Sequence, residues 1–452
     1  MVDTARKLKL LYIAPYFPPS AAAGVHRMMR VCRYLPKDRF EIDVLTRNLG
    51  SDPGGEELLR QVPDGVSVYR ADLSGGKKSE SSVRIAKPEN VEAKNKSPIK
   101  TYLQWLINPL RNAKELIQET PDKHVGWCKP MLKLGKELCS NHSYDLLMTS
   151  GPPHSIHLVG LQLKKETGTP WVADFRDPWA RRPWDVLHNP WGQWLLPKYE
   201  RNVISNASAV LLNTTATLQD FVSAYSDLSK DKFQWVPNGM DPDLPAIVEN
   251  LLSQRASTSR KGSEPLTLCH AGSLYGNRRP DGLFDAMSLL QKQGVECRLL
   301  QIGIVDDAPS MVAHLERLGI RQLVEFIPRI PHAEVLRIMA GVDLHVVLQP
   351  DGPFMIPGKV YEMIAYPQPI VAICDSPVTI EVVEKAGGTH AASRDPIGIA
   401  KAIQSAARMI DDLEFNQKRI AARNQFDGRQ IVERLGLVLE AVSKRKDAGV
   451  PS

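Results

Sequence analysis

The stretch Leu268-Cys269-His270-Ala271-Gly272-Ser273-Leu274-Tyr275-Gly276-Asn277-Arg278-Arg279-Pro280-Asp281 decides the fold class of this chain. It opens as a continuous apolar strand, passes through a loop that contains glycine, and leads into a helix. Continuous apolar strands are typical of parallel sheets that helices cover on both faces. Loop amides and helix N-termini bind phosphate, and arginine adds paired hydrogen bonds. Gly272, Arg278 and Arg279 are therefore candidate phosphate-binding residues, unless this is a plain loop with solvated arginines.

The same alternation of strand and helix extends to both sides of that stretch. In the second half of the chain we expect strands at 266–271, 298–302, 324–327, 344–348 and 370–373, separated by helices at 281–293, 309–318, 331–340, 357–366 and 376–386. In the first half we expect strands at 9–14, 40–46, 66–69, 144–148, 171–175, 209–213 and 233–236, with helices that include 25–35, 101–118 and 125–140. This alternation predicts an α/β fold with two Rossmann-like domains whose strand ends face a cleft.

The length of 452 residues suits two domains of about 200 residues better than one core. We expect an N-terminal domain at 1–240, with a flexible polar insertion at 74–100, and a second domain at 241–425. A helical tail at 426–452 is expected to pack back on the N-terminal domain. Asp241-Pro242-Asp243 resembles a D-x-D metal motif, but it follows an Asn-Gly turn, so we interpret it, with the polar segment 250–263, as linker.

Bulk properties exclude several classes of protein. The net charge of +6 is too small for a dedicated nucleic-acid binder, but it suits anionic substrates or an anionic membrane face. Six scattered cysteines without a C-x-x-C pair argue for a reducing compartment and against a disulfide framework or zinc site. No apolar run approaches about 18 residues. We therefore expect a cytoplasmic protein, with peripheral contact at the inner membrane face left open, and no metal or cofactor.

Three segments of the N-terminal half carry groups at predicted strand ends. Gly24 ends a Pro/Ser/Ala loop, where a ligand can approach the backbone closely. Arg176 and Asp177 follow a buried strand, where charges are costly unless they are paired or used, and a structural Asp–Arg pair is the alternative. His154 follows two prolines, and it either contacts a ligand or caps a helix. The loop from Pro18 to Gly24 matches neither G-x-G-x-x-G nor a P-loop, which disfavours a dehydrogenase.

The segment Pro357-Gly358-Lys359-Val360-Tyr361-Glu362 predicts a helix start. Lys359 could reach a diphosphate, and the Glu362 carboxylate could accept two hydroxyls of a ribose or sugar. Taken alone, an exposed lysine and a glutamate favoured by the helix dipole explain the segment equally simply.

In this order, the segments resemble the retaining GT-B glycosyltransferases of the group 1 class, family 4. The resemblance covers nearly the whole chain outside 74–100. It rests on Ala14-Pro15-Tyr16-Phe17-Pro18-Pro19-Ser20 with Gly24, on Val236-Pro237-Asn238-Gly239-Met240-Asp241, on Ala271-Gly272-Ser273-Leu274, on 357–362, and on Pro367-Gln368-Pro369-Ile370.

The resemblance implies a role for each candidate residue. Glu362 would bind the nucleotide ribose, Arg279 would replace a diphosphate-binding lysine, and Gly24 would approach the diphosphate. Arg176 falls where many members carry a histidine near the sugar, with Asp177 beside it. Two positions depart from the pattern: Phe354 stands where the first Glu of E-x7-E is usual, and Ser273 where an arginine is usual. Lys359 would then supply the missing positive charge.

The resemblance also implies the partners. We expect a UDP- or GDP-linked sugar as donor, a glycan or lipid-linked acceptor, and no nucleic acid. Five of eight tryptophans lie between Trp171 and Trp194 with Arg181 and Arg182 among them, which suits sugar stacking, a membrane interface, or a loop packed by aromatics. Two alternatives remain: a sugar-nucleotide epimerase of the same architecture, and a non-catalytic relative that binds nucleotide sugars.

Overall fold

The computed structural model describes residues 6–22, 24–50, 52, 55–72, 120–181, 190–254, 265–276, 278–349, 352–410 and 412–444. The expected insertion at 74–100 and the expected helix at 101–118 lie outside these residues. The chain divides into two compact units. Unit 1 comprises Met1–Val236 and Val432–Ser452, and unit 2 comprises Pro237–Ile431.

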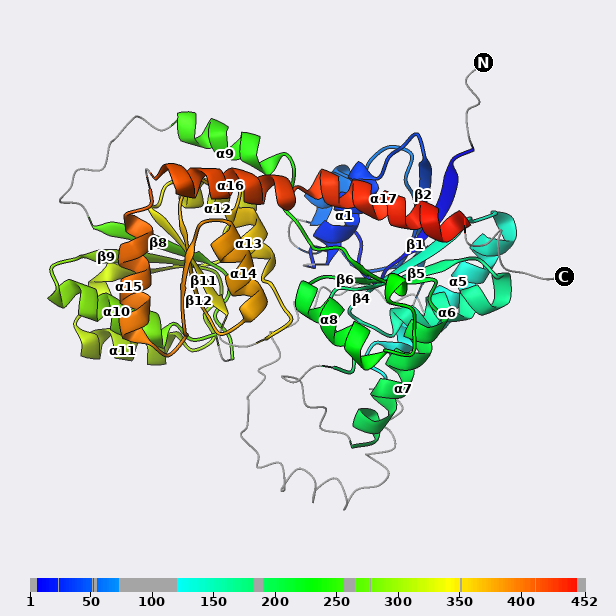
Figure 1. Cartoon of the computed structure of the whole chain (residues 1–452), viewed down its shortest axis with the longest axis horizontal. Coiled ribbons are helices and arrows are strands. Elements are labelled where there is room, and N and C mark those ends of the chain that lie inside the picture. The colour runs from blue at the N-terminus through cyan, green and yellow to red at the C-terminus, as the bar shows by residue number, and fades with distance from the viewer. Residues whose placement is uncertain are drawn as a thin grey trace. The chain divides into compact units, whose positions relative to one another are not determined.

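Unit 1 is built on a seven-stranded parallel sheet with the strand order β3-β2-β1-β4-β5-β6-β7 (Figure 1). Its strands are β1 Leu8–Ile13, β2 Phe40–Arg47, β3 Ser67–Ala71, β4 Leu146–Gly151, β5 Trp171–Phe175, β6 Ala209–Leu212 and β7 Phe233–Trp235. Its helices are α1 Val25–Tyr34, α2 Gly55–Arg60, α5 Cys128–Asn141, α6 Ile156–Thr167, α7 Pro190–Asn206 and α8 Thr215–Ala224, with short 3-10 turns η1 Val125–Trp127 and η2 Lys230–Lys232. Leu10 to Ile13 of β1 are fully buried because the sheet is covered on both faces.

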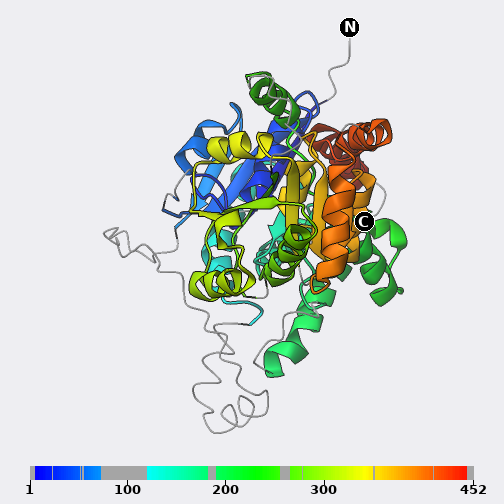
Figure 2. The ribbon, with the colours of Figure 1, turned by 90° about the vertical axis from the view of Figure 1, so that its left-hand side faces the viewer.

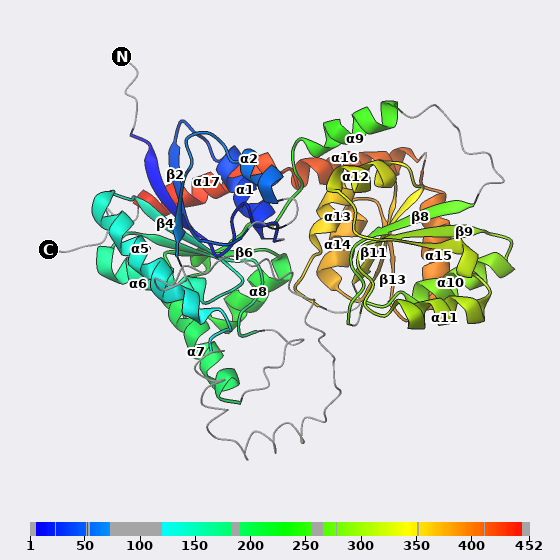
Figure 3. The same cartoon turned by 180° about the vertical axis from the view of Figure 1, so that it is seen from behind.

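One face of this sheet packs against α5, α6, α7 and α8, and α5 and α6 lie in front of it in Figure 3. Helix α17, Gly428–Lys444, crosses from unit 2 into unit 1. Within unit 1 it buries Leu435 and Leu439, and Arg39 donates to Glu440 at 2.8 Å and to Glu433. The C-terminal segment is thus part of the cover of this sheet.

Unit 2 contains a six-stranded parallel sheet with the order β10-β9-β8-β11-β12-β13. Its strands are β8 Leu266–Ala271, β9 Cys297–Ile302, β10 Val324–Ile327, β11 Leu344–Gln349, β12 Ile370–Cys374 and β13 Thr389–Ala391. Its helices are α9 Leu244–Ser253, α10 Asp281–Lys292, α11 Ala308–Leu318, α12 His332–Ala340, α13 Gly358–Met363, α14 Pro377–Lys385, α15 Pro396–Ala407 and α16 Leu413–Gln425, with the 3-10 turn η3 Arg321–Leu323. Helices α10, α11 and α15 share one apolar core with the sheet, and Figure 2 shows α15, in orange, along the strands.

The predicted α/β class with two parallel-sheet units is confirmed. Every predicted strand is present, with ends shifted by a few residues. The sequence interpretation missed strand β13 and helices α2, α7, α8 and α9. The linker interpretation of 250–263 is wrong for residues 250–253, which belong to α9, where the apolar residues Leu244 and Val248 are buried on one face. Among the described residues, no helix is long and apolar enough to cross a membrane.

Candidate donor and transfer sites

The strand orders place two sets of loops at the edges where ligands bind in open α/β sheets. In each sheet the order reverses between neighbouring strands, β1 and β4 in unit 1 and β8 and β11 in unit 2. Ligands in such folds lie beyond the carboxyl ends of the strands at this reversal. The loops after β1, β4 and β8 carry Gly24, His154 and Gly272, and helix α13, which follows β11, carries Glu362.

The unit 1 edge contains a pocket built around Arg176. Ala14, Pro15, Tyr16, Gly24, Met28, Ser150 and Arg176 line it. The Arg176 guanidinium donates from Nε to the Gly151 carbonyl at 3.0 Å and from Nη2 to the Pro152 carbonyl at 2.5 Å. A methyl group on Gly24 would lie 1.9 Å from Arg176 Nη1. The group that closely approaches Gly24 in this structure is therefore the Arg176 side chain.

Asp174, just before Arg176, belongs to a buried ion pair. Arg27 of α1 donates to its two oxygens at 2.9 and 2.8 Å, and Ser150 Oγ donates to Oδ2 at 2.8 Å. Arg27 also donates to the Val236 carbonyl at 3.0 Å, which ties the end of β7 to the sheet. The structural Asp–Arg pair considered from sequence therefore exists, but its arginine is Arg27. Asp177 lies half-buried beyond Arg176.

His154 lies in an aromatic stack, and only 2% of its surface is exposed. Its ring stacks on Phe175 and on Trp179, each with centroids 5.5 Å apart. His157 lies in the same stack, 4.4 Å from Phe175, and bonds Thr149 Oγ1 at 2.8 Å. Burial lowers the pKa of His157 to about 3. His154 thus packs in the aromatic core that supports these loops, and the ligand contact considered for it from sequence stays a prediction.

A buried carboxylate that sequence reasoning did not single out supports the loop after Arg176. Glu200 of α7 accepts from the backbone N–H groups of Trp179 and Ala180 at 3.0 and 2.7 Å, and from the Tyr225 hydroxyl at 2.6 Å. Burial raises the pKa of Glu200, and these hydrogen bonds partly oppose that rise. Glu200 thereby fixes the position of the chain that follows Asp177.

In unit 2, Gly272 turns the chain at the end of β8. Its carbonyl accepts from Gln301 Nε2 at 2.7 Å, and Gln301 Oε1 bonds His270 Nδ1 at 2.7 Å. A methyl group on Gly272 would lie 3.1 Å from the His270 ring. Burial lowers the pKa of His270 to about 4, so this imidazole is neutral near pH 7. The neutral His270–Gln301 pair holds the glycine loop in place.

The two arginines of this loop differ in their partners. Arg279 donates to both oxygens of Asp281, at 2.7 and 3.2 Å, and to Asp307 at 2.8 Å. These hydrogen bonds raise the pKa of Arg279 and neutralise its charge within the loop. Arg278 instead lies over the exposed Tyr275 ring, 4.8 Å from the centroid. The charge of Arg278 is therefore the more available of the two to an anion.

Lys359 and Glu362 form an ion pair at the beginning of α13, with Nζ 2.8 Å from Oε2. His332, at the start of α12, lies 3.6 Å from the same oxygen. Burial favours a higher pKa for Glu362, but the His332 hydrogen bond and the Lys359 charge outweigh it and hold the pKa at about 2. Glu362 is therefore a carboxylate at any physiological pH, and its side chain is 29% exposed. Phe354 lies half-buried in the preceding loop.

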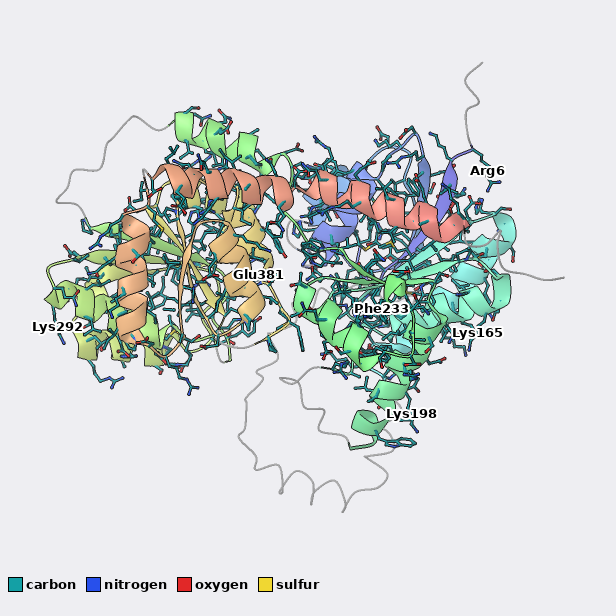
Figure 4. The ribbon with its side chains drawn as sticks, viewed as in Figure 1. Arg6, Lys165, Lys198, Phe233, Lys292 and Glu381 are labelled. Atoms are coloured by element: carbon teal, nitrogen blue, oxygen red, sulfur yellow. The ribbon has the colours of Figure 1, made fainter. Side chains whose placement is uncertain are left out.

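Two further segments were discussed from sequence, the tryptophan-rich segment 171–194 and Asp241-Pro242-Asp243. Of the tryptophan-rich segment, Trp194 on α7 is 56% exposed, and Lys198 Nζ lies 3.1 Å above its ring. Figure 4 labels Lys198 on α7. Asp243 precedes the first turn of α9, and its backbone N–H donates to Asp241 Oδ1 at 3.1 Å.

Comparison with known families decides the class of protein. A family model described as "Glycosyl transferase 4-like domain" matches residues 23–239, and one described as "Glycosyl transferases group 1" matches residues 254–421. The chain belongs to the group 1 glycosyltransferases. Since the two matches cover most of the chain, the predicted enzyme class is confirmed. No curated protein matches the sequence of this glycosyltransferase.

Solved structures share the GT-B fold of this glycosyltransferase at low sequence identity. HepE of Anabaena, solved with UDP, is 16% identical with a TM-score of 0.63, over 96% of this chain and 100% of that one. A glycosyltransferase from Rickettsia africae is 12% identical (TM-score 0.63; 96% and 98% covered). Sucrose-phosphate synthase from Thermosynechococcus elongatus is 13% identical (TM-score 0.63; 97% and 100% covered).

Proposed function

We propose that this glycosyltransferase moves a hexose-type sugar from a UDP- or GDP-linked donor to a glycan or lipid-linked acceptor in cell-surface polysaccharide assembly. We further propose retention of anomeric configuration, no metal requirement, and a cytoplasmic enzyme in peripheral contact with the inner membrane face. The observation that carries the proposal is the ion pair of Lys359 with an ionised Glu362 on α13, the helix that follows β11. HepE, which has the same fold, was solved with UDP and with UDP-glucose.

The proposed donor site lies in unit 2. The Glu362 carboxylate accepts hydrogen bonds only, so it suits the vicinal hydroxyls of a ribose. Lys359 and Arg278 supply positive charge for the diphosphate, and the backbone at Gly272 allows close approach. In the proposed donor site, Arg279 fixes this loop through its ion pairs with Asp281 and Asp307.

The proposed transfer site lies in unit 1. Arg176 lines a pocket at the β1–β4 reversal, with Gly24 packed against its guanidinium. Its charge suits a diphosphate oxygen or a sugar hydroxyl, and Asp177 follows it in the chain. As the sugar–phosphate bond breaks, negative charge grows on the departing nucleoside diphosphate. Fixed cations that are already oriented stabilise that charge without reorganisation.

Peripheral membrane contact rests on α7. The exposed Trp194 ring and the Lys198 ammonium above it form an amphipathic pair, and such pairs suit the boundary between lipid headgroups and acyl chains. The net charge of +6 favours an anionic surface in the same way.

The test of donor binding is a panel of UDP- and GDP-sugars assayed for hydrolysis and for transfer. We expect turnover with one nucleotide class, and a loss of at least about a hundredfold in kcat/KM in Glu362→Gln and Arg278→Ala, since each removes a fixed electrostatic contact. Near-normal turnover in both variants contradicts the assignment. Release of an epimerised sugar nucleotide without an acceptor would identify an epimerase instead.

Two measurements test the finer claims. The anomeric configuration of the product, read by NMR, distinguishes retention from inversion. Activity that persists in excess EDTA supports metal independence, and activity that EDTA abolishes and Mg²⁺ or Mn²⁺ restores contradicts it.

A further inference from the structure

The C-terminal end of α13 presents buried carbonyl groups that the helix itself cannot pair. This helix has only six residues, Gly358–Met363, and it carries both Lys359 and Glu362. The last carbonyls of any helix have no intrahelical donor. Met363, Ile364 and Ala365 are at most 1% exposed, so solvent cannot take that place. A buried carbonyl without a donor costs about 1–3 kcal/mol.

Two arginines of α16 donate to these carbonyls. Arg423 donates from Nε to the Ile364 carbonyl at 3.1 Å and from Nη2 to the Ala365 carbonyl at 2.6 Å. Arg419 donates from Nη1 to the Met363 carbonyl at 3.2 Å and from Nη2 to the Gln368 carbonyl at 3.0 Å. The two side chains are four residues apart, and therefore on one face of α16.

This arrangement is costly in electrostatic terms. Arg419 is only 2% exposed, and its guanidinium lies 4.9 Å from the Phe415 ring centroid. Burial lowers the pKa of Arg419 to about 9, and the neighbouring charge of Arg423 adds to that effect. Filling the same space with apolar side chains would avoid this cost. Apolar side chains, however, would take away the donors to the Ile364 and Ala365 carbonyls, and a planar guanidinium can reach two carbonyls at once.

Contacts along α16 extend the same support to the rest of α13. Phe426, which follows α16, packs edge-to-face on Tyr361 at 5.3 Å. Tyr361 lies between Lys359 and Glu362 on this helix. The bond from Arg419 to Gln368 holds the chain just before β12, so the segment from α13 to β12 is fixed at both of its ends.

We propose that Arg419 and Arg423 are positioning residues of the donor site, which set the orientation of Lys359 and Glu362 through the C-terminal turn of α13. This inference rests on the proposed function, in which α13 binds the nucleoside diphosphate. Neither arginine touches the donor. Their positive charge at the C-terminal end of α13 also matches the helix dipole.

The experiment uses the full-length enzyme with Arg423→Lys and Arg423→Met, and Arg419→Lys as a second site. Lys418→Met is the matched control, because Lys418 is an exposed cation on the same helix that pairs with Glu414 one turn away at 2.7 Å. We measure binding of UDP and GDP by calorimetry, the KM for donor and for acceptor, and the melting temperature. All binding is measured well below the melting temperature of each variant.

We expect Arg423→Met to raise the donor KM and the nucleotide Kd by about tenfold to a hundredfold, the range for a misplaced binding group. Arg423→Lys should recover part of the loss, because it restores one donor. The acceptor KM and Lys418→Met should stay unchanged. A purely structural role would lower the melting temperature and the active fraction while leaving the nucleotide Kd of the folded protein unchanged, and that result would overturn the inference.

Glu362→Gln separates this inference from the proposed function. If Glu362→Gln weakens nucleotide binding and the Arg423 variants do not, only the positioning role fails. If neither Glu362→Gln nor the Arg423 variants change nucleotide binding, the assignment of α13 to the donor site fails.

Discussion

Replacement of Gly24 by alanine is the sharpest test of how the unit 1 edge is built. The added Cβ would lie 1.9 Å from Arg176 Nη1 and 2.6 Å from Arg176 Cζ, far inside van der Waals contact. Gly24 has a φ of −66°, which alanine adopts without strain. The backbone therefore contributes nothing to the effect, and the contact with Arg176 decides it.

The magnitude follows from the bonds that Arg176 must give up. To make room, the guanidinium must leave the Gly151 carbonyl at 3.0 Å or the Pro152 carbonyl at 2.5 Å. Loss of one hydrogen bond from a charged group costs about 1.5–3 kcal/mol of unfolding free energy. For a unit of this size, that corresponds to a fall in Tm of roughly 3–12 °C. We expect transfer activity to fall as well, since Arg176 leaves its place in the pocket.

The assay compares thermal melting and sugar transfer in Gly24→Ala, in Arg176→Ala and in the double variant. Gly126→Ala is the matched control, because a Cβ on Gly126 meets nothing within 4 Å. If the contact with Arg176 is the cause, alanine at position 24 should cost nothing further once Arg176 is alanine. A wild-type melt and wild-type activity in Gly24→Ala would refute the reasoning, as would an undiminished penalty in the double variant.

Four further predictions concern neighbouring groups. Burial raises the pKa of Glu200 above the ordinary value of about 4.3. The stability that Glu200 contributes is therefore complete at lower pH and is lost as the pH rises through the raised pKa. As a result, Tm should fall more steeply with rising pH in the wild type than in Glu200→Gln. Glu200→Ala removes the acceptor of two backbone N–H groups, so it should lower the free energy of unfolding by about 2–4 kcal/mol in a denaturant titration. A smaller loss would show that water replaces the carboxylate as acceptor. Arg278→Ala should raise the donor KM without lowering Tm, whereas Arg279→Ala should raise the donor KM and lower Tm. If the two variants change KM and Tm equally, the assignment of Arg278 to anion binding and of Arg279 to loop stability is contradicted. His154→Phe should keep transfer within about threefold of wild type by kinetic assay, because phenylalanine preserves the stacking on Phe175 and Trp179. A loss comparable to that of Arg176→Ala would instead indicate a ligand contact at His154.

The fold could be predicted closely because continuous apolar strands such as β1 and β8 signal their burial on both faces directly. The same signal placed Gly24, Gly272 and Glu362 after the right strands, since a loop between a strand and a helix must lie at the sheet edge. The partners of these side chains could not be predicted from the sequence. Arg27 and Asp174, for example, form an ion pair although they lie 147 residues apart in the chain. A signal for Arg27 did exist, namely a charged residue on the otherwise apolar, buried face of α1.

His154 and Arg279 also show that residue type and loop position do not determine which groups bind a ligand. Each has a residue type and a loop position that suit binding, but three-dimensional neighbours decide its use. His154 is enclosed by Phe175 and Trp179 from the next strand and its loop. Arg279 is neutralised by Asp307, 28 residues away. Sequence spacing indicates which groups reach an edge, whereas partners determine which of them keep a free charge.

That distinction gives the Lys359–Glu362 pair a particular meaning. An arginine held by two carboxylates, such as Arg279, must lose both partners before it can bind an anion. Lys359 has one close carboxylate partner in the pair and three donor hydrogens, so it can contact a phosphate oxygen while it stays near Glu362. Each contact that Lys359 makes with phosphate weakens its hold on Glu362 Oε2, and this frees an acceptor for a ribose hydroxyl. Within the proposed donor site, the Lys359–Glu362 pair would thus bind both the diphosphate and the ribose of the donor. Because this pair is already assembled, the entropy cost of ordering the two side chains on binding is lower.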